Sequence, residues 1–249
     1  ILVLPAETVP GTPVKDLFHP YEDFIYEIGL TPNRMDAMSH LGVARDLCAY
    51  LSHHQQKTVD IVSPLLNQEP LPATGDHGFT VSIQNPEACQ RYSGIVIKHI
   101  RVQASPLWMQ AKLKAIGVKP INNVVDITNY ILHETGQPLH AFDADRISGN
   151  QISVGHYPAG TVFRSLDDKE RKLLATDLMI GDANGPMCMA GVYGGKDSGV
   201  SEGTTTIFLE SACFNGTFVR RSSLAHQLRT DAAVRFEKGT DVNQTIPVL

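Results

Sequence analysis

Long apolar runs, paired cysteines and an excess of basic side chains are all missing from this sequence of 249 residues. No stretch reaches the roughly 18 consecutive apolar residues of a membrane-spanning helix, so we expect no membrane partner. The cysteines include no C-x-x-C pair, which disfavours a zinc knuckle, and a chain of this size needs no disulfide framework. Reduced thiols in a cytoplasmic protein are the simplest interpretation of Cys48, Cys89, Cys188 and Cys213.

The charge balance and the first residues exclude further classes. The net charge is −5, whereas a protein that grips a long nucleic acid by its phosphates is usually basic. Contact with nucleic acid would have to be local, and the best local candidate is 220–238, whose alternative interpretation is a solvated helix face. The chain opens without Met and without a basic segment typical of a signal peptide, which predicts a piece of a longer protein.

Composition divides the sequence into a small and a large unit. The stretch "SPLLNQEPLPATGDHG" at 63–78 is rich in proline and glycine and predicts a linker or long loop. We assign 1–67 to the small unit, 68–78 to the linker and 79–249 to the large unit. Helical and strand patterns follow one another without a steady βαβ rhythm, which predicts an α+β fold with antiparallel or mixed sheets and packed helices.

In the small unit, "FIYEIGL" at 24–30 alternates like a β-strand. The following residues recur at helical spacing, with Asn33 or Asp36 as the expected cap, so this unit is predicted to be α+β as well.

In the large unit, a strand is expected over 92–102, then a helix with Ser105 as its N-cap and Pro106 at its first position. "NNVVDITNYILHETG" predicts a second helix that Gly136 closes, with Val124, Ile127 and Ile131 on one face. After Asn150 come five short strand-like pieces, and two helices around 218–227 and 231–238 close the chain.

Few residues indicate a particular chemistry when they are considered alone. The sequence holds no GxxxxGK[ST] loop, no GxGxxG after a strand, no HExxH and no GxSxG. His140, in "GQPLHAFDADRI", is a core histidine, a ligand or part of a reaction site, although the absence of a second nitrogen ligand nearby makes a metal site improbable. Glu210 ends an apolar strand and lies by default on the surface. The glycines of "GVYGG" fit either a tight turn or a close approach to a ligand.

Four ordered stretches, taken together, resemble one family. "LTPNRMDAMSHLGVARDL", "RYSGIVIKHI" with "SPLWMQAKLKAIGVKPINNVVDITNYILHETGQPLHAFD", "MAGVYGGKDSGVSEGTTTIFLESACF" and "RTDAAVRFEKGTD" are similar to bacterial phenylalanyl-tRNA synthetase β subunits. The resemblance covers almost the whole chain. It implies that 1–67 is the later part of a B1-like module and that 79–249 is a B3/B4 editing domain.

The resemblance also implies a set of site residues. Glu210 matches the family's tyrosine-reading glutamate, His140 its editing histidine and Thr230 its pocket threonine, and these three are the expected catalytic residues. Thr230 is otherwise a helix N-cap and Ala232 an ordinary packing residue. Ala233 and Arg229 depart from the serine and histidine often found there. The expected substrate-binding residues are Asn129, Gly194, Glu210 and Ala232, and no metal site is expected.

The implied activity is hydrolysis of tyrosine wrongly attached to tRNA(Phe). A hydrophobic pocket rejects poorly a substrate that only adds a hydroxyl, so a second, hydrolytic site that demands the hydroxyl is useful. The expected partners are the 3′ end of tRNA(Phe) and the α subunit of an α2β2 enzyme. ATP and magnesium are expected for the whole ligase and no cofactor for this part. The alternative is a structural, tRNA-positioning module with little activity alone, and a metal hydrolase is the weakest option.

Overall fold

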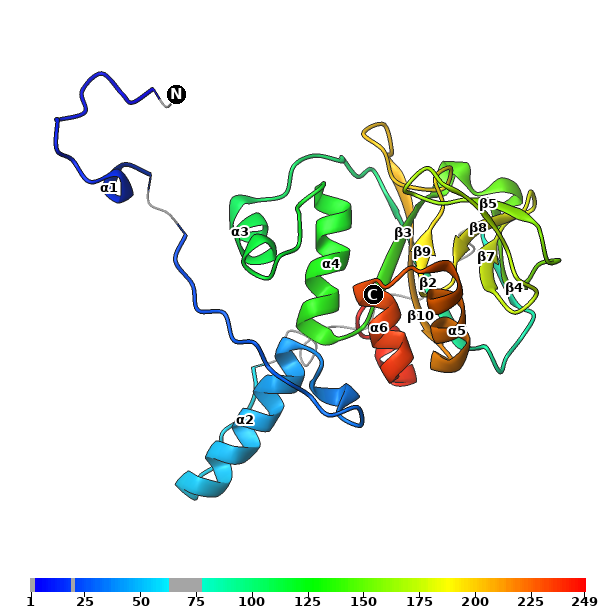
Figure 1. Cartoon of the computed structure of the whole chain (residues 1–249), viewed down its shortest axis with the longest axis horizontal. Coiled ribbons are helices and arrows are strands. Elements are labelled where there is room, and N and C mark those ends of the chain that lie inside the picture. The colour runs from blue at the N-terminus through cyan, green and yellow to red at the C-terminus, as the bar shows by residue number, and fades with distance from the viewer. Residues whose placement is uncertain (1–2, 19–20, 63–77) are drawn as a thin grey trace.

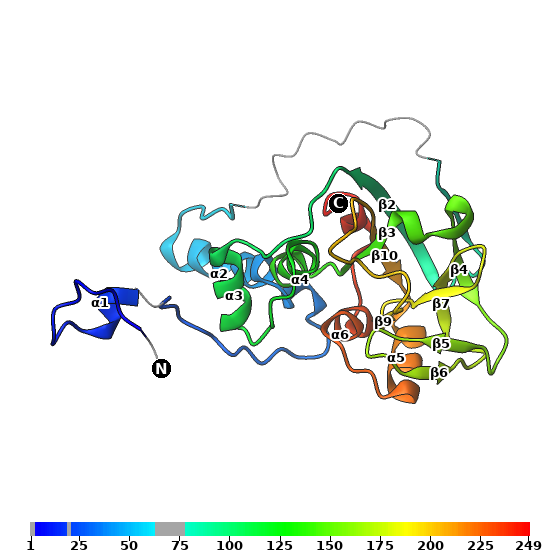
Figure 2. The ribbon, with the colours of Figure 1, turned by 90° about the horizontal axis from the view of Figure 1, so that it is seen from above.

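The computed structural model describes residues 3–18, 21–62 and 78–249, and these form two regions of very different texture (Figure 1). The N-terminal region, up to residue 62, holds α1 (Val14–Phe18), the short 3-10 helix η1 (Met35–Ala37) and α2 (His40–Gln55). The body, from residue 78 onward, holds every described strand. Figures 1 and 2 both show α1 lying away from the body.

Two sheets form most of the body. The first has five strands in the order β1-β4-β7-β8-β9, and within it β1 pairs with β4 in parallel while the other pairs are antiparallel. Its strands are β1 (Thr80–Ile83), β4 (Gln151–His156), β7 (Leu178–Gly181), β8 (Pro186–Met189) and β9 (Tyr193–Gly194). The second sheet is antiparallel in the order β2-β10-β3, built from β2 (Cys89–Lys98), β10 (Thr206–Phe214) and β3 (Leu139–Asp143).

The remaining elements cover these sheets. A small antiparallel hairpin consists of β5 (Val162–Arg164) and β6 (Glu170–Lys172). The helices of the body are α3 (Leu107–Ala115), α4 (Asn123–Thr135), α5 (Gly216–His226) and α6 (Asp231–Lys238), with 3-10 turns η2 (Ala144–Arg146), η3 (Ser148–Asn150) and η4 (Val242–Thr245). The predicted α+β fold with mixed and antiparallel sheets is confirmed.

The central strand β10 separates two apolar clusters because its side chains alternate between faces. Phe208, Ala212 and Phe214 point into the main core, which also contains residues of β4, β7, β8, α5 and α6. Ile207 and Leu209 point the other way, into a second core with Val124 of α4 and Ala141 of β3. The helix α4 therefore covers one face of the sheet and the main core covers the other.

Several local predictions hold and others are wrong. The α6 bounds agree with the predicted 231–238, and Gly136 closes α4 at φ 86°, as expected of a left-handed C-cap. The helix face of α4 is different, because Leu132 is buried whereas Ile127 is 45% exposed. The strand predicted at 92–102 runs instead from Cys89 to Lys98.

Two predicted caps are wrong because other groups compete for the side chains. The α2 helix starts later than expected and Ser39 accepts from the Gly42 amide, while Asp36 pairs with Arg34. Asn33 accepts from the Thr31 hydroxyl instead of capping a helix. Ser105 does not cap α3, since its hydroxyl donates to the buried carboxylate of Asp126.

The strand predicted at 24–30 is also wrong: these residues are extended but unpaired, and residues 3–18 and 21–62 contain no strand. The small unit, as far as it is described, is therefore helical and extended rather than α+β. Apart from Gly78, the predicted linker at 68–78 lies outside the described residues, and the assignment of 1–67 and 79–249 to separate modules stays a prediction.

Candidate functional site

Glu210 lies in the middle of β10, on the face that builds the main core. It alternates with Phe208 and Ala212, and in register it stands opposite Gly94 of β2 on one side and His140 of β3 on the other. Directly opposed residues of an antiparallel pair project from the same face and lie close together. The sheet therefore places Glu210 and His140 side by side, although 70 positions separate them in the sequence.

The Glu210 carboxyl is almost completely removed from water, at 5% exposure. This overturns the default expectation of a surface position. The hydroxyl of Tyr92 donates a hydrogen bond to Oε2 at 3.1 Å. Burial disfavours the charged form and raises the pKa of Glu210 to about 8, although the bond from Tyr92 opposes part of that rise. A proton is therefore bound to this carboxyl over most of the neutral range.

His140 is partly buried, and its ring meets the ring of Phe142 edge to face at 4.5 Å between centroids. Burial lowers its pKa to about 4, because the charged imidazolium loses its hydration there. Within the described residues no side chain or backbone group bonds to its ring nitrogens. The imidazole is therefore neutral at pH 7, and its nitrogens are available to a ligand.

A small cavity of about 70 Å³ opens beside these two side chains. It contains four of the predicted site residues, namely His140, Glu210, Gly194 and Ala232. Its other lining residues are mostly apolar: Pro138, Leu139, Cys188, Gly191, Val192, Tyr193 and Phe236. Strands β3, β8, β9 and β10 and the helix α6 thus converge on one pocket with a single carboxyl.

Gly194 keeps this cavity open. A Cβ at this position would lie 3.0 Å from Cε1 of His140 and 2.9 Å from a methyl group of Leu166. Either the imidazole or the neighbouring chain would have to move to accept any side chain there. The sequence predicted a close approach or a tight turn for these glycines, and at Gly194 the structure has the close approach.

Thr230 and Asn129 do not line the cavity. Thr230 is the N-cap of α6: its Oγ1 accepts from the Ala233 amide at 3.1 Å and donates to the Val192 carbonyl at 3.0 Å. Since Val192 lines the cavity, Thr230 ties α6 to the cavity wall from behind. Asn129 lies on α4. A catalytic role for Thr230 and a binding role for Asn129 stay predictions.

The two departures from the family pattern also lie outside the cavity. Ala233 is buried in the main core and Arg229 is exposed, and neither lines the cavity. Sequence reasoning missed Tyr92 and Cys188. The Tyr92 hydroxyl bonds to Glu210, and the Cys188 thiol donates to the Tyr193 carbonyl at 3.4 Å in the cavity wall. Alternation along β2 and β8 indicates which side chains share a face, but only the register shows that they meet Glu210.

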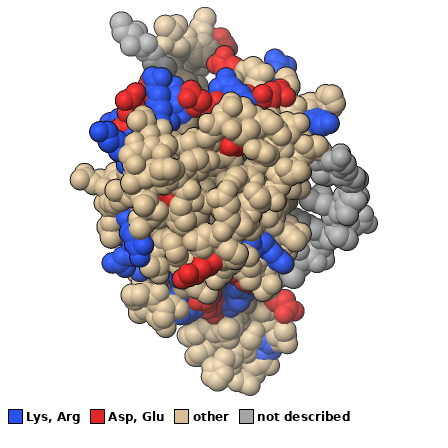
Figure 3. All heavy atoms as spheres, turned by 90° about the vertical axis from the view of Figure 1, so that its right-hand side faces the viewer, with Lys and Arg blue, Asp and Glu red and all other residues tan. Residues whose placement is uncertain are grey.

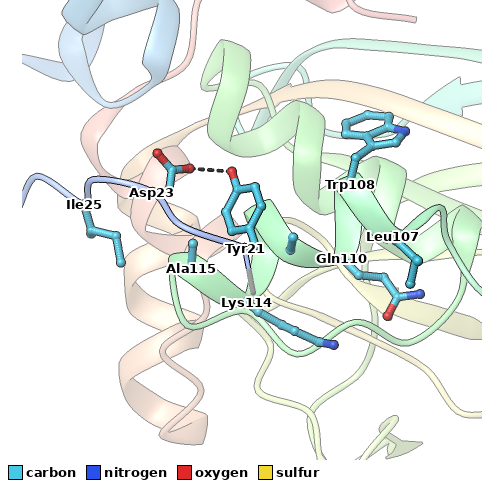
Figure 4. Close-up of a pocket in the computed structure, with 9 residues that line it drawn as sticks. Tyr21, Asp23, Ile25, Leu107, Trp108, Gln110, Lys114 and Ala115 are labelled. Carbon is cyan, nitrogen blue, oxygen red and sulfur yellow. Dashed lines mark hydrogen bonds between the residues drawn. The ribbon is translucent and has the colours of Figure 1, made fainter. Parts of the chain in front are cut away.

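A larger hollow of about 710 Å³ lies elsewhere, between the extended N-terminal chain and α3 (Figure 4). Tyr21, Asp23 and Ile25 line one side and residues of α3 the other, and Leu107 and Trp108 are 82% and 51% exposed. Its walls face solvent, and the two pKa shifts there arise chiefly from the hydrogen bond that the Tyr21 hydroxyl donates to the Asp23 carboxylate, which raises the pKa of Tyr21 and lowers that of Asp23. The cavity at Glu210, with a buried carboxyl and a buried imidazole whose pKa values are shifted, is the better candidate site despite its smaller size.

Residues 3–18, 21–62 and 78–249 hold no group of three His, Cys, Asp or Glu side chains placed to bind a metal ion. None of the helices within these ranges is long and apolar enough to cross a membrane. On the face drawn in Figure 3, basic and acidic side chains are interspersed around a broad uncharged area.

Comparisons with known proteins find relatives that match almost the whole chain. The phenylalanine–tRNA ligase β subunit of Bacteroides fragilis is 50% identical over 246 residues, and that of Carboxydothermus hydrogenoformans is 43% identical over 242. The matches cover 99% and 97% of this chain but only 30% and 29% of those relatives, so the chain spans about a third of their length.

A solved N-terminal fragment of the phenylalanyl-tRNA synthetase β subunit from Pyrococcus horikoshii is also similar, at 15% identity and a TM-score of 0.44. That match covers 78% of this chain and 58% of the fragment. The B3/4 domain family matches residues 88–249, which contain both sheets except β1 and every residue of the cavity. By the match over 88–249, this chain belongs to the B3/4 domain family, and along almost its whole length it is similar to about a third of phenylalanine–tRNA ligase β subunits.

Proposed function

We propose that the cavity at Glu210 is an editing site that hydrolyses tyrosine mis-attached to tRNA(Phe). The observation that supports it most is a single buried carboxyl, beside a neutral imidazole, in a cavity that is otherwise lined by apolar side chains and backbone. The similarity to phenylalanine–tRNA ligase β subunits supplies the substrate class. The cavity has room for several water molecules.

Glu210 reads the phenol hydroxyl in this proposal. A buried polar group left without a partner costs about 1–3 kcal/mol, so a site built for a hydroxyl disfavours phenylalanine. With a pKa of about 8, Glu210 donates from its protonated oxygen to the phenol at neutral pH and accepts from the phenol at higher pH. Phenylalanine satisfies neither state. An acceptor-only carboxylate thus occurs only in the alkaline range.

His140 positions water or the terminal ribose rather than acting as a strong base. A group whose pKa is about 4 takes a proton from water only weakly at neutral pH, whereas a neutral ring nitrogen orients water well. In the reaction the water oxygen bonds to the ester carbon, the bond from that carbon to the ribose oxygen breaks, and one water proton ends on the ribose oxygen. Thr230 supports the wall through Val192.

This hydrolysis needs water alone. ATP and magnesium belong to the ligation reaction proposed for the whole ligase, together with the α subunit of an α2β2 enzyme. Within the described ranges no group of three ligating side chains fits a metal ion, so no step here is assigned to one. A cytoplasmic location follows from protein synthesis as the proposed role. The alternative, a module that only positions tRNA, is favoured by the small share of the relatives' length that this chain covers.

The test is deacylation of Tyr-tRNA(Phe) by this chain, with Phe-tRNA(Phe) as the control substrate. We expect selective hydrolysis that Glu210→Ala abolishes and that the matched change Glu202→Ala, at an exposed glutamate just before β10, leaves intact. EDTA should have no effect, and inhibition by it would favour a metal hydrolase. Hydrolysis that appears only within a complete α and β enzyme would favour dependence on the rest of the synthetase. If Glu210→Ala in that enzyme left the hydrolysis of Tyr-tRNA(Phe) unchanged, the proposal would be overturned.

A further inference from the structure

The Glu210 carboxyl is held at one oxygen only. Its Oε2 accepts from Tyr92, and no other hydrogen bond to this carboxyl occurs within the described residues. The second oxygen, Oε1, accepts no hydrogen bond from a described residue, yet it is not among the fully buried polar atoms without a partner, so it is accessible. Glu210 also lines the cavity. Tyr92 therefore takes up the oxygen away from the ligand space, and Oε1 is the oxygen that meets the cavity.

The register explains how Tyr92 reaches Glu210. Tyr92 stands opposite Ala212, two residues along the same face of β10 from Glu210. The direct partner of Glu210 is Gly94, which has no side chain to occupy the intervening space. A diagonal neighbour in an antiparallel pair is within reach of a long aromatic side chain. The phenol of Tyr92 thus reaches Glu210 along this diagonal.

The Tyr92 ring is itself fixed. It packs against the main core and lies nearly parallel to the ring of Phe208, at an interplanar angle of 19° and 6.5 Å between centroids. A Cβ at Gly94 would collide with that Phe208 ring, at 2.2 Å from Cζ. Gly94 and Phe208 together therefore leave Tyr92 little freedom, and a fixed donor fixes the orientation of its acceptor.

We propose that Tyr92 is the positioning and specificity-determining residue of the editing site: its hydroxyl holds Oε2 of Glu210 so that Oε1 faces the tyrosyl substrate. This inference rests on the proposed function. Because Tyr92 donates to Oε2, a neutral Glu210 carries its proton on Oε1, where it points to the phenol oxygen of the substrate. An ionised Glu210 presents Oε1 as the acceptor. Tyr92 thus keeps the carboxyl ready for a second phenol in both states.

A purely structural role for Tyr92 would affect stability but not the ionisation of Glu210. The titratable groups that face Glu210 are Tyr92, Cys89 and Cys188, with His140 as its cross-strand neighbour. Of these, only the Tyr92 hydroxyl bonds to the carboxyl and lowers its pKa. Removing that hydroxyl must therefore raise the pKa of Glu210 above about 8, and this shift separates positioning from packing.

The experiment compares Tyr92→Phe with Tyr157→Phe, a matched loss of one hydroxyl from a tyrosine that packs on the main core outside the cavity. Titration of carboxyl-¹³C-labelled glutamate by NMR gives the pKa of Glu210, and deacylation of Tyr-tRNA(Phe) gives kcat and KM. For Tyr92→Phe we expect a higher pKa and about a tenfold higher KM with a smaller change in kcat, because the phenol is remote from the ester. Tyr157→Phe should change neither.

A double variant tests whether the two residues act as one unit. In a Glu210→Gln background, Tyr92→Phe should change KM by less than about twofold, since coupled residues are not additive. A full tenfold effect in that background, or an unchanged pKa of Glu210 in Tyr92→Phe, would overturn the proposal. If no variant hydrolyses the ester but the pKa still rises, the positioning of Glu210 stands and the proposed function fails.

Discussion

Phe24 and Phe142 are the same side chain in opposite surroundings. Phe24, in the extended chain before η1, is 87% exposed, whereas Phe142 of β3 is 0% exposed and contacts His140. Phe24 lies in a stretch that alternates like a strand, whereas no strand was predicted around Phe142. Only the stretch around Phe142 pairs with another strand, since β10 lies beside it with a complementary register. Alternation alone is therefore not enough to make a strand, and a pairing partner decides which segments are strands.

The same contrast extends to the titratable groups of the two regions. In the N-terminal region Arg34 bridges Asp36 and Asp46 on the surface, where solvent screens the interaction. In the body Glu210 and His140 are withdrawn from water, and their pKa values are displaced in opposite directions. We expect the stability of the molecule, and its dependence on pH, to reside almost entirely in the body.

The largest difference in the free energy of unfolding should appear when each of the two phenylalanines is replaced by alanine in a separate variant. Phe142→Ala removes a fully buried ring and should lower the free energy of unfolding by about 3–5 kcal/mol. Phe24→Ala removes an exposed ring and should change it by less than about 0.5 kcal/mol. Urea unfolding followed by circular dichroism measures both. Similar losses in the two variants would break the comparison.

The next effect concerns Glu210→Gln at alkaline pH. The folded pKa of about 8 lies above the ordinary value of 4.5, so the folded state holds a proton that the unfolded state loses between these values. Wild-type stability should therefore fall as the pH rises from about 4.5 to 8. The amide cannot ionise, and the variant should be more stable than wild type by on the order of a few kcal/mol above pH 8. Parallel pH–stability curves for the two proteins would contradict this.

His140 should act on the acid side with the opposite sign. Its folded pKa of about 4 lies below the ordinary value of 6.5, so the unfolded state binds the extra proton first. Stability from this group is complete above pH 6.5 and is lost as the pH falls toward 4. His140→Gln should flatten that acid limb, which thermal unfolding at a series of pH values measures. His53→Gln, at an exposed histidine of α2, serves as the control and should leave the limb unchanged.

The smallest effects should come from two helix caps. Asn122 accepts from the Val125 amide at the start of α4 in the body, and Ser39 accepts from the Gly42 amide at the start of α2. Asn122→Ala should cost about 1 kcal/mol of global stability. Ser39→Ala should loosen α2 locally, visible as faster hydrogen exchange, with a smaller effect on global unfolding. A larger global loss for Ser39→Ala would mean that α2 folds with the body.

The sequence predicted best where local chemistry decides the outcome. The bounds of α6 and the end of α4 at Gly136 depend on caps and periodicity within one segment, and they agree with the structure. Ser105 failed as a cap because Asp126, 21 positions away, takes its hydroxyl. Tyr92 could not be found by pattern, since its meeting with Glu210 depends on the pairing of β2 with β10.

Some residues of the candidate site could be predicted, whereas the contacts of others could not. Resemblance identified His140, Glu210, Gly194 and Ala232, which the structure brings together in one cavity. It also suggested Thr230, whose hydroxyl is occupied by Val192 and Ala233, and Asn129, which lies on α4. Motifs transfer the residues of a site, whereas the hydrogen bonds that each residue already makes depend on the packing.

The pairing of β2 with β10 also affects how this chain folds while it is being synthesised. Lys98 at the end of β2 pairs with Thr206, so 108 positions separate the two partners. At a synthesis rate of about 5–20 residues per second, β2 waits roughly 5–20 s for the strand that completes its sheet. Its apolar edge is open to other chains during that interval. Newly made copies should therefore depend on chaperones until β10 has emerged.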